Sequence, residues 1–519
     1  MTEHHAPPPT SALPLDGSWH RAHRTYRPRR SVVGWRDGGT TNPHLDHTPH
    51  LDHTMRSDHP QPVGAVAGED LTDESQDAAR AHLLDDQVAF FADDKRPVAE
   101  PAAEELAEHL ARIGERPDCS GAAGPRLIEA VVAAGLSGRG GGHFPTAGKL
   151  RAALRAVQSE SRADRLAFVV ANGAEGEPAS VKDAALIQSR PHLVIDGLAC
   201  AAEVIGAQHA VIWLHEHDHA SYDALSTAVR QRRAHGITEP AVRIMVGRSH
   251  YLTGESRSVV AGVSGRLPVP YFTRVPTATA GIGGHPTLIQ NVETLARLAL
   301  IARTGPQHPM PGPLLSVLGQ AADGSSVLIA REGSADLTVA EAIDLGWQRP
   351  GRPQAVLVGG YGGTWLRWDE VAGLRIAELD RRPSELGPHQ ASLGPGILLA
   401  LPRHACPVQE TAAVVAYLAA SSARQCGPCT RGGPAIAQAW QRLAESRGGR
   451  SAERKLLPLA AQLDGRGACA LPDAIARITR SAVRVFADDI ARHEGGAGCA
   501  GQDAPLTLPV PDLDVLIGG

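Results

Sequence analysis

Residues 166–183 read LAFVVANGAEGEPASVKD, and they give the clearest indication of the fold class. Its first seven residues form an apolar run, which is typical of a strand buried on both faces. Asparagine, glycine and glutamate end the run, and a helical pattern follows from about residue 180. A buried strand, a polar loop and then a helix form the repeating unit of a parallel α/β sheet.

The same alternation continues along the chain. Two further apolar runs, HAVIWLH (209–215) and AVRIMVG (241–247), are predicted strands. The stretch 180–206 between the first two strands is predicted to be helical, with a break at Pro191. Helical patterns also cover 102–113 and 124–135. The fold class predicted is therefore α/β, with a parallel-sheet domain over residues 81–311.

Two smaller domains are predicted to follow. Residues 312–385 contain four short strand patterns around one helix at 337–346, which suggests a small β-grasp domain of the SLBB type. Residues 386–498 contain four amphipathic helical patterns, which predict a bundle. The ends of the chain, 1–80 and 499–519, are predicted to be a disordered tail and a loose tail.

Composition excludes several classes of protein. The chain has 519 residues and a net charge of −5, so nucleic acid is not the expected partner. No apolar run reaches the ~20 residues that span a bilayer, and no secretory signal is recognisable. Seven scattered cysteines are typical of metal or redox use in the cytoplasm rather than of disulfides. The histidines of 44–54 could bind a metal, but a solvated tail is the favoured interpretation.

The stretch GLSGRGGGHFPTAGKL (135–150) is a candidate anion site. Gly138, Gly140, Gly141 and Gly142 allow the backbone to turn several N–H groups toward an anion, and Arg139 and Lys149 add positive charge. The stretch follows a helix and is not a dinucleotide fingerprint. A flexible turn is the alternative interpretation.

The loop after the first strand is the second candidate site. Ligands of open α/β sheets bind outside the carboxyl ends of strands, which is where this loop begins. Asn172 offers a donor and an acceptor to a planar ring, while Glu175 and Glu177 suit sugar hydroxyls. Taken alone, two glutamates on a loop are more often solvated surface.

Five ordered motifs carry a resemblance to a known family. They are the glycine loop, N-x-x-E-x-E-P-x-x-x-K-D from Asn172, YLTGESRSVVAGVSGR (251–266), GGHPTLIQNVET (283–294) and LGPGILL (393–399). Over about residues 120–495 the chain resembles the 51 kDa-type flavin subunit, also called the F subunit, of NADH:quinone oxidoreductase (respiratory complex I). It is more distantly similar to the C subunit of Rnf-type oxidoreductases.

The resemblance implies FMN and NAD(H) as cofactors. The positions that match flavin-contacting residues are Gly138, Gly140, Gly141, Lys149, Asn172, Glu175, Tyr251, Gly254, Glu255 and Asn291, and Arg139 and Gly142 belong to the same glycine loop. Phe144 and Glu177 match residues that frame the NADH site.

The chain departs from the family at several of these positions. Ala174 and Ser256 stand where the family has acidic residues. Ala152 and Pro276 stand where aromatic rings hold the adenine. Each lost ring contact is worth ~1 kcal/mol, so NADH is expected to bind ten-fold or more weakly. FMN binding is better supported than NADH binding.

Three cysteines match the family's iron–sulfur ligands. Cys426, Cys429 and Cys469 correspond to the second, third and fourth ligands of a [4Fe-4S] cluster, whereas the first ligand is Ala423. Three thiolates could hold a cluster with one open iron or a [3Fe-4S] species, or Cys406, Cys499 or a histidine could complete the set. A zinc site and a vestigial site are the alternatives.

The resemblance implies an NADH dehydrogenase-type oxidoreductase. Electrons would pass from NADH through FMN to an iron–sulfur cluster, and then to a ferredoxin-like or other iron–sulfur partner. The cofactor carries the chemistry, so no side chain is expected to act as a catalytic group. Two alternatives stay open: a non-catalytic or assembly subunit, and a flavoprotein with another electron donor.

Overall fold

The computed structural model describes residues 82–159, 166–320, 325–344, 346–347, 351–382, 390–446, 452–499 and 501–512. The predicted disordered tail, with its histidine-rich stretch, lies outside these residues.

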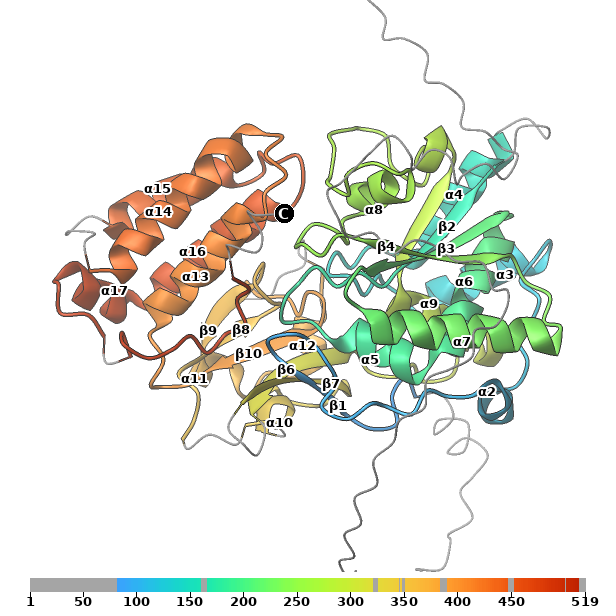
Figure 1. Ribbon diagram of the computed structural model, residues 1–519, viewed down its shortest axis with the longest axis horizontal. Helices are drawn as coiled ribbons and strands as arrows, with labels where there is room; N and C mark the ends of the chain where they lie inside the picture. Colours follow the sequence, from blue (N-terminus) through green and yellow to red (C-terminus); the bar gives the residue numbers. More distant parts are fainter. Residues whose placement is uncertain are drawn as a thin grey trace, which may run out of the picture. The chain divides into compact units, whose positions relative to one another are not determined.

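A four-stranded parallel sheet forms the first half of the described chain (Figure 1). Its strands are β2 (Phe168–Asn172), β3 (His209–His215), β4 (Val242–Gly247) and β5 (Thr287–Asn291), and all three pairings are parallel. The fold class predicted from the sequence is thus confirmed.

Helices connect and cover these strands. They are α2 (Leu106–Ile113), α3 (Ala123–Ala133), α4 (Thr146–Ser159), α5 (Lys182–Ser189), α6 (Pro191–Ile205), α7 (His219–His235), α8 (Ser256–Val263) and α9 (Val292–Thr304), with a 3-10 turn at Ile282–Gly284. The predicted break at Pro191 is confirmed, because this residue begins α6. Proline suits that position, where its missing N–H leaves no helical hydrogen bond unmade.

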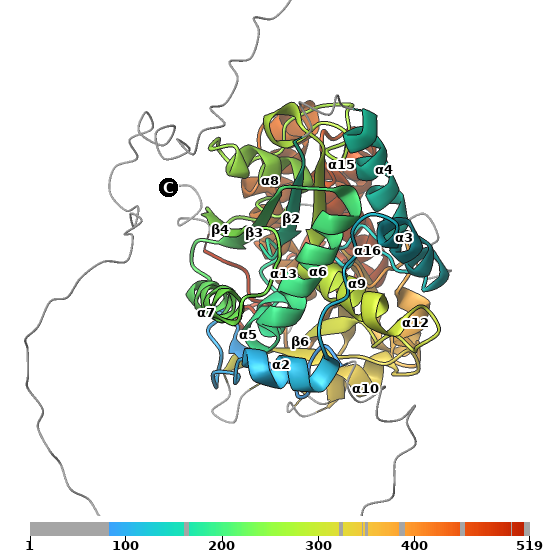
Figure 2. The same ribbon diagram turned by 90° about the vertical axis from the view of Figure 1, so that its right-hand side faces the viewer.

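Both faces of the parallel sheet are buried. Along β2, Val169 and Ala171 face the large core that contains α6, whereas Phe168 and Val170 face a second core with Trp213 and α8. Successive strand side chains point to opposite faces, so an unbroken apolar run is what a sheet covered on both sides requires. Figure 2 shows α6 and α9 side by side against the sheet.

The strand order is β4-β3-β2-β5. The chain proceeds from β2 outward to β4 and then returns to place β5 on the other side of β2. The order therefore reverses between β2 and β5. Such a reversal opens a crevice at the carboxyl ends of the two strands, and ligands of open α/β sheets bind there.

A mixed six-stranded sheet follows, in the order β1-β7-β6-β10-β8-β9. The strands are β1 (Val88–Phe91), β6 (Leu314–Gln320), β7 (Ser326–Glu332), β8 (Ala355–Val358), β9 (Thr364–Arg367) and β10 (Ile397–Leu401), and the short helices are α10 (Val339–Asp344), α11 (Trp368–Val371) and α12 (Ile376–Leu379).

Two strands of this sheet come from outside the predicted range 312–385. β1 pairs with β7 in antiparallel fashion, and β10 pairs with β6 in parallel. No strand was predicted at 88–91, because VAFF is too short to show a strand period. The domain limits and the SLBB type remain predictions.

The last helices form the predicted bundle (orange and red in Figure 1). They are α13 (Pro407–Ala420), α14 (Gly433–Ala444), α15 (Ala452–Leu463), α16 (Leu471–Val485) and α17 (Ala487–Glu494), and a π-helical turn at Pro428–Gly432 precedes α14. The pattern predicted as one helix over 471–493 is divided at Phe486, whose φ of −111° interrupts the helix.

The segment after the bundle is not the loose tail that the sequence suggested. Thr507 and Leu508 are buried, and their backbone N–H groups donate to the carboxylate of Glu410 on α13. A buried carboxylate needs such donors, and Glu410 therefore holds the described part of this segment, 501–512, against the bundle.

Candidate functional site

Two asparagines mark the crevice at the strand-order reversal. Asn172 ends β2 and Asn291 ends β5, and the two are direct partners in the register of the parallel pair. The Asn172 Nδ2 donates to the carbonyl of Gly254 at 2.8 Å. The Asn291 Nδ2 donates to Asp183 at 2.5 Å, and its Oδ1 accepts from the N–H of Glu293 as the N-cap of α9. Both predicted residues thus lie in the crevice.

The glycine loop lies beside these strand ends. A Cβ atom placed on Gly140 would lie 3.5 Å from the Cβ of Asn291. Gly141 has a φ of +92°, a conformation that only glycine adopts without strain. The N–H of Gly138 donates to Phe144, but among the described residues no group accepts from the N–H groups of Gly140, Gly141 and Gly142.

Lys149 brings an ammonium group to this loop from the first turn of α4. Burial lowers its pKa, and no carboxylate of the described residues pairs with it. Its Nζ instead lies 5.8 Å from the centroid of the Phe144 ring. Unpaired backbone N–H groups beside an unpaired, partly buried ammonium are what an anion-binding site requires.

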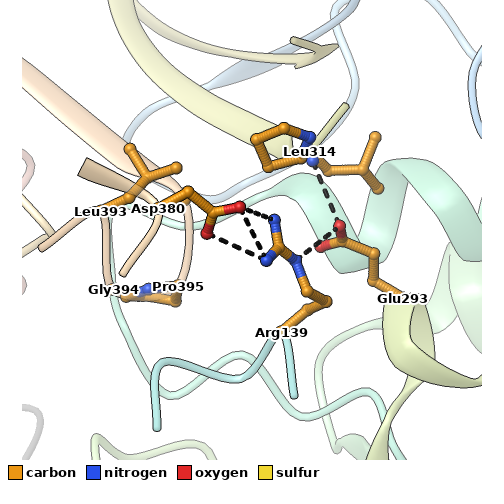
Figure 3. Close-up of a pocket in the computed structure, with 9 residues that line it drawn as sticks. Arg139, Glu293, Leu314, Asp380, Leu393, Gly394 and Pro395 are labelled. Atoms are coloured by element: carbon orange, nitrogen blue, oxygen red, sulfur yellow. Dashed lines mark hydrogen bonds and ion pairs between the residues drawn. The ribbon is translucent and has the colours of Figure 1, made fainter. Parts of the chain in front are cut away.

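Arg139, predicted to bind the cofactor, is directed to protein carboxylates instead (Figure 3). Its guanidinium donates to both oxygens of Asp380 at 2.9–3.0 Å and to Glu293 at 3.3 Å. The neighbouring His143 contacts the carbonyl of Gly394 through Nε2 at 3.0 Å. Arg139 and His143 therefore anchor the loop to other parts of the chain. The LGPGILL motif provides one of these contacts through the carbonyl of Gly394.

Glu293 is the centre of a buried network under the loop. Its carboxylate contacts Arg139, Lys182 and Arg297, and Lys182 also contacts Asp183 at 2.7 Å. Although burial opposes ionisation, these cations hold the pKa of Glu293 far below its usual range. No role was predicted for Glu293, Lys182 or Asp183, although the K-D and NVET motifs that contain them were the available signal.

The loop 251–255 closes the crevice on another side. A Cβ on Gly176 would lie 2.1 Å from the carbonyl oxygen of Tyr251, and one on Gly254 would lie 2.5 Å from that of Ala174. Glycine at these positions lets the two loops meet backbone to backbone. The Tyr251 ring reaches the bundle, where it meets Tyr417 edge-on with centroids 6.1 Å apart.

Glu177 is the predicted acidic residue that keeps an unpaired atom. One carboxylate oxygen accepts from the N–H of Tyr361, whereas Oε1 is buried without a partner among the described residues. Burial raises the pKa of Glu177 to about 7. Phe144, the other residue predicted to frame the NADH site, is 64% exposed. The Phe144 ring is thus accessible to a ligand, whereas the Glu177 carboxyl is buried and keeps one oxygen without a hydrogen-bond partner of its own in the described chain.

Two predicted glutamates have structural contacts instead. Glu175 accepts from the Ser180 hydroxyl at 2.5 Å and from the N–H of Ala184 in α5. Glu255 is the N-cap of α8 and accepts from the N–H groups of Arg257 and Ser258. Both side chains shape the loops of the crevice, and their direct contact with a cofactor remains a prediction.

The predicted cluster ligands meet in the bundle. Cys429 is buried in the π-helical turn, and Cys426 and Cys469 are half-buried. Burial, with smaller contributions from the nearby Cys426 and Cys469, raises the pKa of the Cys429 thiol to about 11. A hollow of about 370 Å³ beside Cys429 is lined by Ala419, Ala420, Arg424, Thr430 and Pro434.

The loop before Cys426 keeps a glycine-like backbone. Arg424 has a φ of +54°, in the left-handed region that glycine favours. Ala423 is packed against the core and provides no ligand atom.

Cys406 does not replace the missing ligand. It caps the N-terminus of α13, while Cys429 lies beside Ala419 and Ala420 at the opposite end of that helix. The 14 residues of α13 separate these ends by about 20 Å, which is too far for the two thiols to share one cluster.

Two family models match the chain. The Nuo51 FMN-binding domain matches residues 131–300, which include the glycine loop and the parallel sheet. The NADH-ubiquinone oxidoreductase-F iron-sulfur binding region matches residues 409–493, which include the three cysteines. The two matches therefore cover the parallel-sheet segment with its glycine loop and the cysteine-bearing part of the bundle.

Relatives extend the similarity over most of the chain. The F subunit of the NADH-quinone oxidoreductase of Streptomyces coelicolor is 27% identical over 73% of this chain and 86% of its own length. The mitochondrial NADH dehydrogenase [ubiquinone] flavoprotein 1 of Dictyostelium discoideum is 25% identical over 70% and 78%. The resemblance predicted from the motifs is thus confirmed: both family models match, and the chain is similar over most of its length to NADH-quinone oxidoreductase flavin subunits at about 27% identity.

The fold recurs in solved structures. An NAD+-reducing [NiFe]-hydrogenase in the air-oxidised state superposes with a TM-score of 0.60 at 24% identity, over 78% of this chain and 67% of that one. The H2-reduced state gives a TM-score of 0.59 at 23% identity, over 72% and 63%. At these identities the likeness establishes the fold alone.

Proposed function

We propose that the chain is an FMN-dependent oxidoreductase of the NADH dehydrogenase type. Electrons would pass from NADH through FMN to an iron–sulfur centre and then to a partner. The observation that carries this proposal is the group of free backbone N–H groups and the unpaired Lys149 beside the end of β5, within a segment that matches an FMN-binding domain.

The residues of the crevice fit FMN. The N–H groups of Gly140, Gly141 and Gly142 together with Lys149 would hold its phosphate, because they form the positive, unpaired part of the site. The strand end at Asn172 and the close-packed loop at Gly254 would hold the ring. Bound FMN accepts a hydride and releases single electrons, and the chain supplies orientation and shelter from water.

Phe144 and Glu177 would receive NADH. The exposed Phe144 ring offers a stacking surface, and the unpaired Glu177 Oε1 is an acceptor for a hydroxyl. Ala152 and the exposed Pro276 supply no aromatic ring for the adenine. NADH is therefore expected to bind more weakly than in relatives that have both rings.

The three cysteines would hold the iron–sulfur centre. Cys426, Cys429 and Cys469 supply three thiolates, and Ala423 leaves the fourth position to solvent or another ligand. A hydrogen bond connects this centre to the flavin domain: Arg257 of α8 donates to the carbonyl of Ala468, the residue before Cys469. This contact places the cysteine loop directly against the element capped by Glu255.

The electron acceptor is proposed to be a ferredoxin-like or other iron–sulfur subunit. Relatives are named as subunits of larger oxidoreductases, which supports a partner that accepts electrons. No helix among the described residues is long and apolar enough to cross a membrane. Peripheral association with a complex in the cytoplasm is the arrangement that we propose.

Anaerobic purification and titration with NADH test this function. We expect flavin absorbance in the purified protein, bleaching of that absorbance by NADH, and iron and sulfide in chemical assays. The Gly141→Val variant serves as the flavin-free control. Bleaching by reduced ferredoxin but not by NADH would replace the proposed donor. A colourless protein that takes up no added FMN would contradict the proposal and favour a non-catalytic subunit.

A further inference from the structure

A second group of metal-ligating side chains lies at the end of the bundle opposite the predicted cluster. Cys406, His493 and Cys499 each offer one atom, and these atoms all lie within 4.8 Å of one another. Cys406 and His493 are buried, whereas Cys499 is half-buried. Cys406 meets His493, 87 positions further along the chain, only through the tertiary fold.

The geometry is that of a tetrahedral site. The Cys406 Sγ lies 3.4 Å from the His493 Nε2. Zinc bonds of about 2.3 Å to sulfur and 2.0–2.1 Å to nitrogen at tetrahedral angles would separate two such atoms by roughly 3.5 Å. The two buried ligands therefore stand at the spacing that one shared ion would impose.

The histidine is oriented as a ligand. Its Nδ1 lies 3.1 Å from the carbonyl oxygen of Leu443, which can only accept a hydrogen bond. The proton is therefore placed on Nδ1, and the lone pair of Nε2 faces Cys406. Metal-binding histidines commonly donate their other N–H to a backbone carbonyl in this way, because the contact fixes the tautomer.

The backbone around Cys406 and Cys499 also suits a metal site. Cys406 is the N-cap of α13, and the N–H of Gln409 donates to its sulfur at 3.4 Å. A helix N-terminus favours a negatively charged sulfur. A Cβ on Gly501 would lie 2.2 Å from the carbonyl oxygen of His404, so glycine is required where the segment that carries Cys499 crosses the entry to α13.

From these observations we infer that Cys406, His493 and Cys499 bind one Zn²⁺ ion, with a fourth position open to solvent on the side of Cys499. The ion would fasten the C-terminal segment to the N-terminus of α13. Zn²⁺ suits two thiolates and one imidazole in a tetrahedral arrangement. The proposal is independent of the flavin and of the Cys426 centre.

Metal analysis of the full chain, purified anaerobically with reductant, tests this site. The wild type should contain one zinc ion per chain after dialysis, and Cys499→Ser should contain none. Cys429→Ser is the matched control: it removes a cysteine at the other end of the bundle and should lose iron but keep zinc. Cys499→His supplies a replacement donor and should retain zinc.

Cobalt provides a second readout. Co²⁺ added to zinc-free wild type and to Cys429→Ser should produce thiolate-to-cobalt absorption, which Cys499→Ser should lack. Equal circular dichroism of the variants excludes loss of metal through unfolding. The proposal is overturned if the wild type is free of zinc, if Cys499→Ser keeps its zinc, or if peptide mapping finds a disulfide between Cys406 and Cys499.

Discussion

Some side chains of the predicted site are bonded to other protein groups, whereas others keep atoms without a partner. Arg139, Glu175 and Glu255 match the flavin site in sequence, yet each is paired with protein atoms. Lys149 and Glu177 keep unpaired charge or an unpaired oxygen. Because an unpaired buried polar atom is unfavourable, ligand contacts are expected at the second group.

Lys149→Ala is expected to weaken FMN binding about ten-fold. A charge-assisted contact with a phosphate is worth about 1.5–3 kcal/mol, and the partial exposure of Lys149 places the loss at the lower end of that range. Quenching of flavin fluorescence during titration of the apoprotein measures the affinity. Lys455→Ala, an exposed lysine of α15, is the control; an equal effect there would contradict the assignment.

The carboxyl of Glu177 predicts a dependence of stability on pH. Burial raises its pKa from 4.5 to about 7, so the folded apoprotein binds this proton more tightly than the unfolded chain does. The associated stability is fully present below about pH 4.5 and is lost as the pH rises through about 7. Glu177→Gln should abolish that loss, as measured by urea unfolding across this range.

The exposed Glu115 provides the control for this titration. Glu115→Gln should leave the pH profile of the free energy of unfolding unchanged. If the free energy of unfolding of Glu177→Gln falls in parallel with that of the wild type between about pH 5 and 7, a group other than Glu177 causes the loss of stability.

Among the elements, the glycine loop is held by side-chain contacts on both sides of Gly140–Gly142, which argues against a flexible turn. Arg139 and His143 attach it to Asp380 and to Gly394, more than 240 positions further along the chain. The loop therefore enters the crevice with its shape already set. A pre-formed site binds its ligand without the entropic cost of ordering a loop.

Gly141→Val is expected to abolish retention of FMN. The φ of +92° disfavours any side chain, and a β-branched one most strongly, by about 1–2 kcal/mol or more for the backbone alone. The ratio of flavin to protein after gel filtration measures retention. Gly148→Ala is the matched control, because a Cβ there meets only Pro145 at 3.9 Å. Wild-type flavin content in Gly141→Val would refute the pocket.

In the described chain as a whole, the bundle contributes two separate groups of cysteines at opposite ends of α13. One end faces the flavin domain through Arg257 and Ala468. The other is tied to the C-terminal segment through Cys406. The cluster ligand that is missing at Ala423 therefore affects only the end of the bundle that lies on the proposed path of the electrons.

Ala423→Cys is expected to raise the iron bound per chain and to slow the loss of the cluster in air. A fourth thiolate at the family position would complete the ligand set of a [4Fe-4S] cluster. Iron and sulfide assays on anaerobic protein give the measure. Ala461→Cys, which adds an exposed cysteine on α15, controls for non-specific iron. Iron content unchanged in Ala423→Cys would count against a family-like site.

Local patterns alone determined much of this protein. The apolar run of β2 and the break at Pro191 are properties of short stretches, so the sequence predicted the α/β sheet and the two-helix segment. The ordered motifs added the family. Hydrophobic periodicity and turn-forming residues act over a few positions, so they can be recognised without a structure.

Only the tertiary structure decided which of the recognised residues are free to bind. Arg139 turns to Asp380, β1 joins β7, and Cys406 meets His493 and Cys499, each across long stretches of chain. The partner of a buried charge or thiol is the distant group that the fold packs beside it, because desolvation and packing determine the pairing. No local pattern in the sequence records that choice.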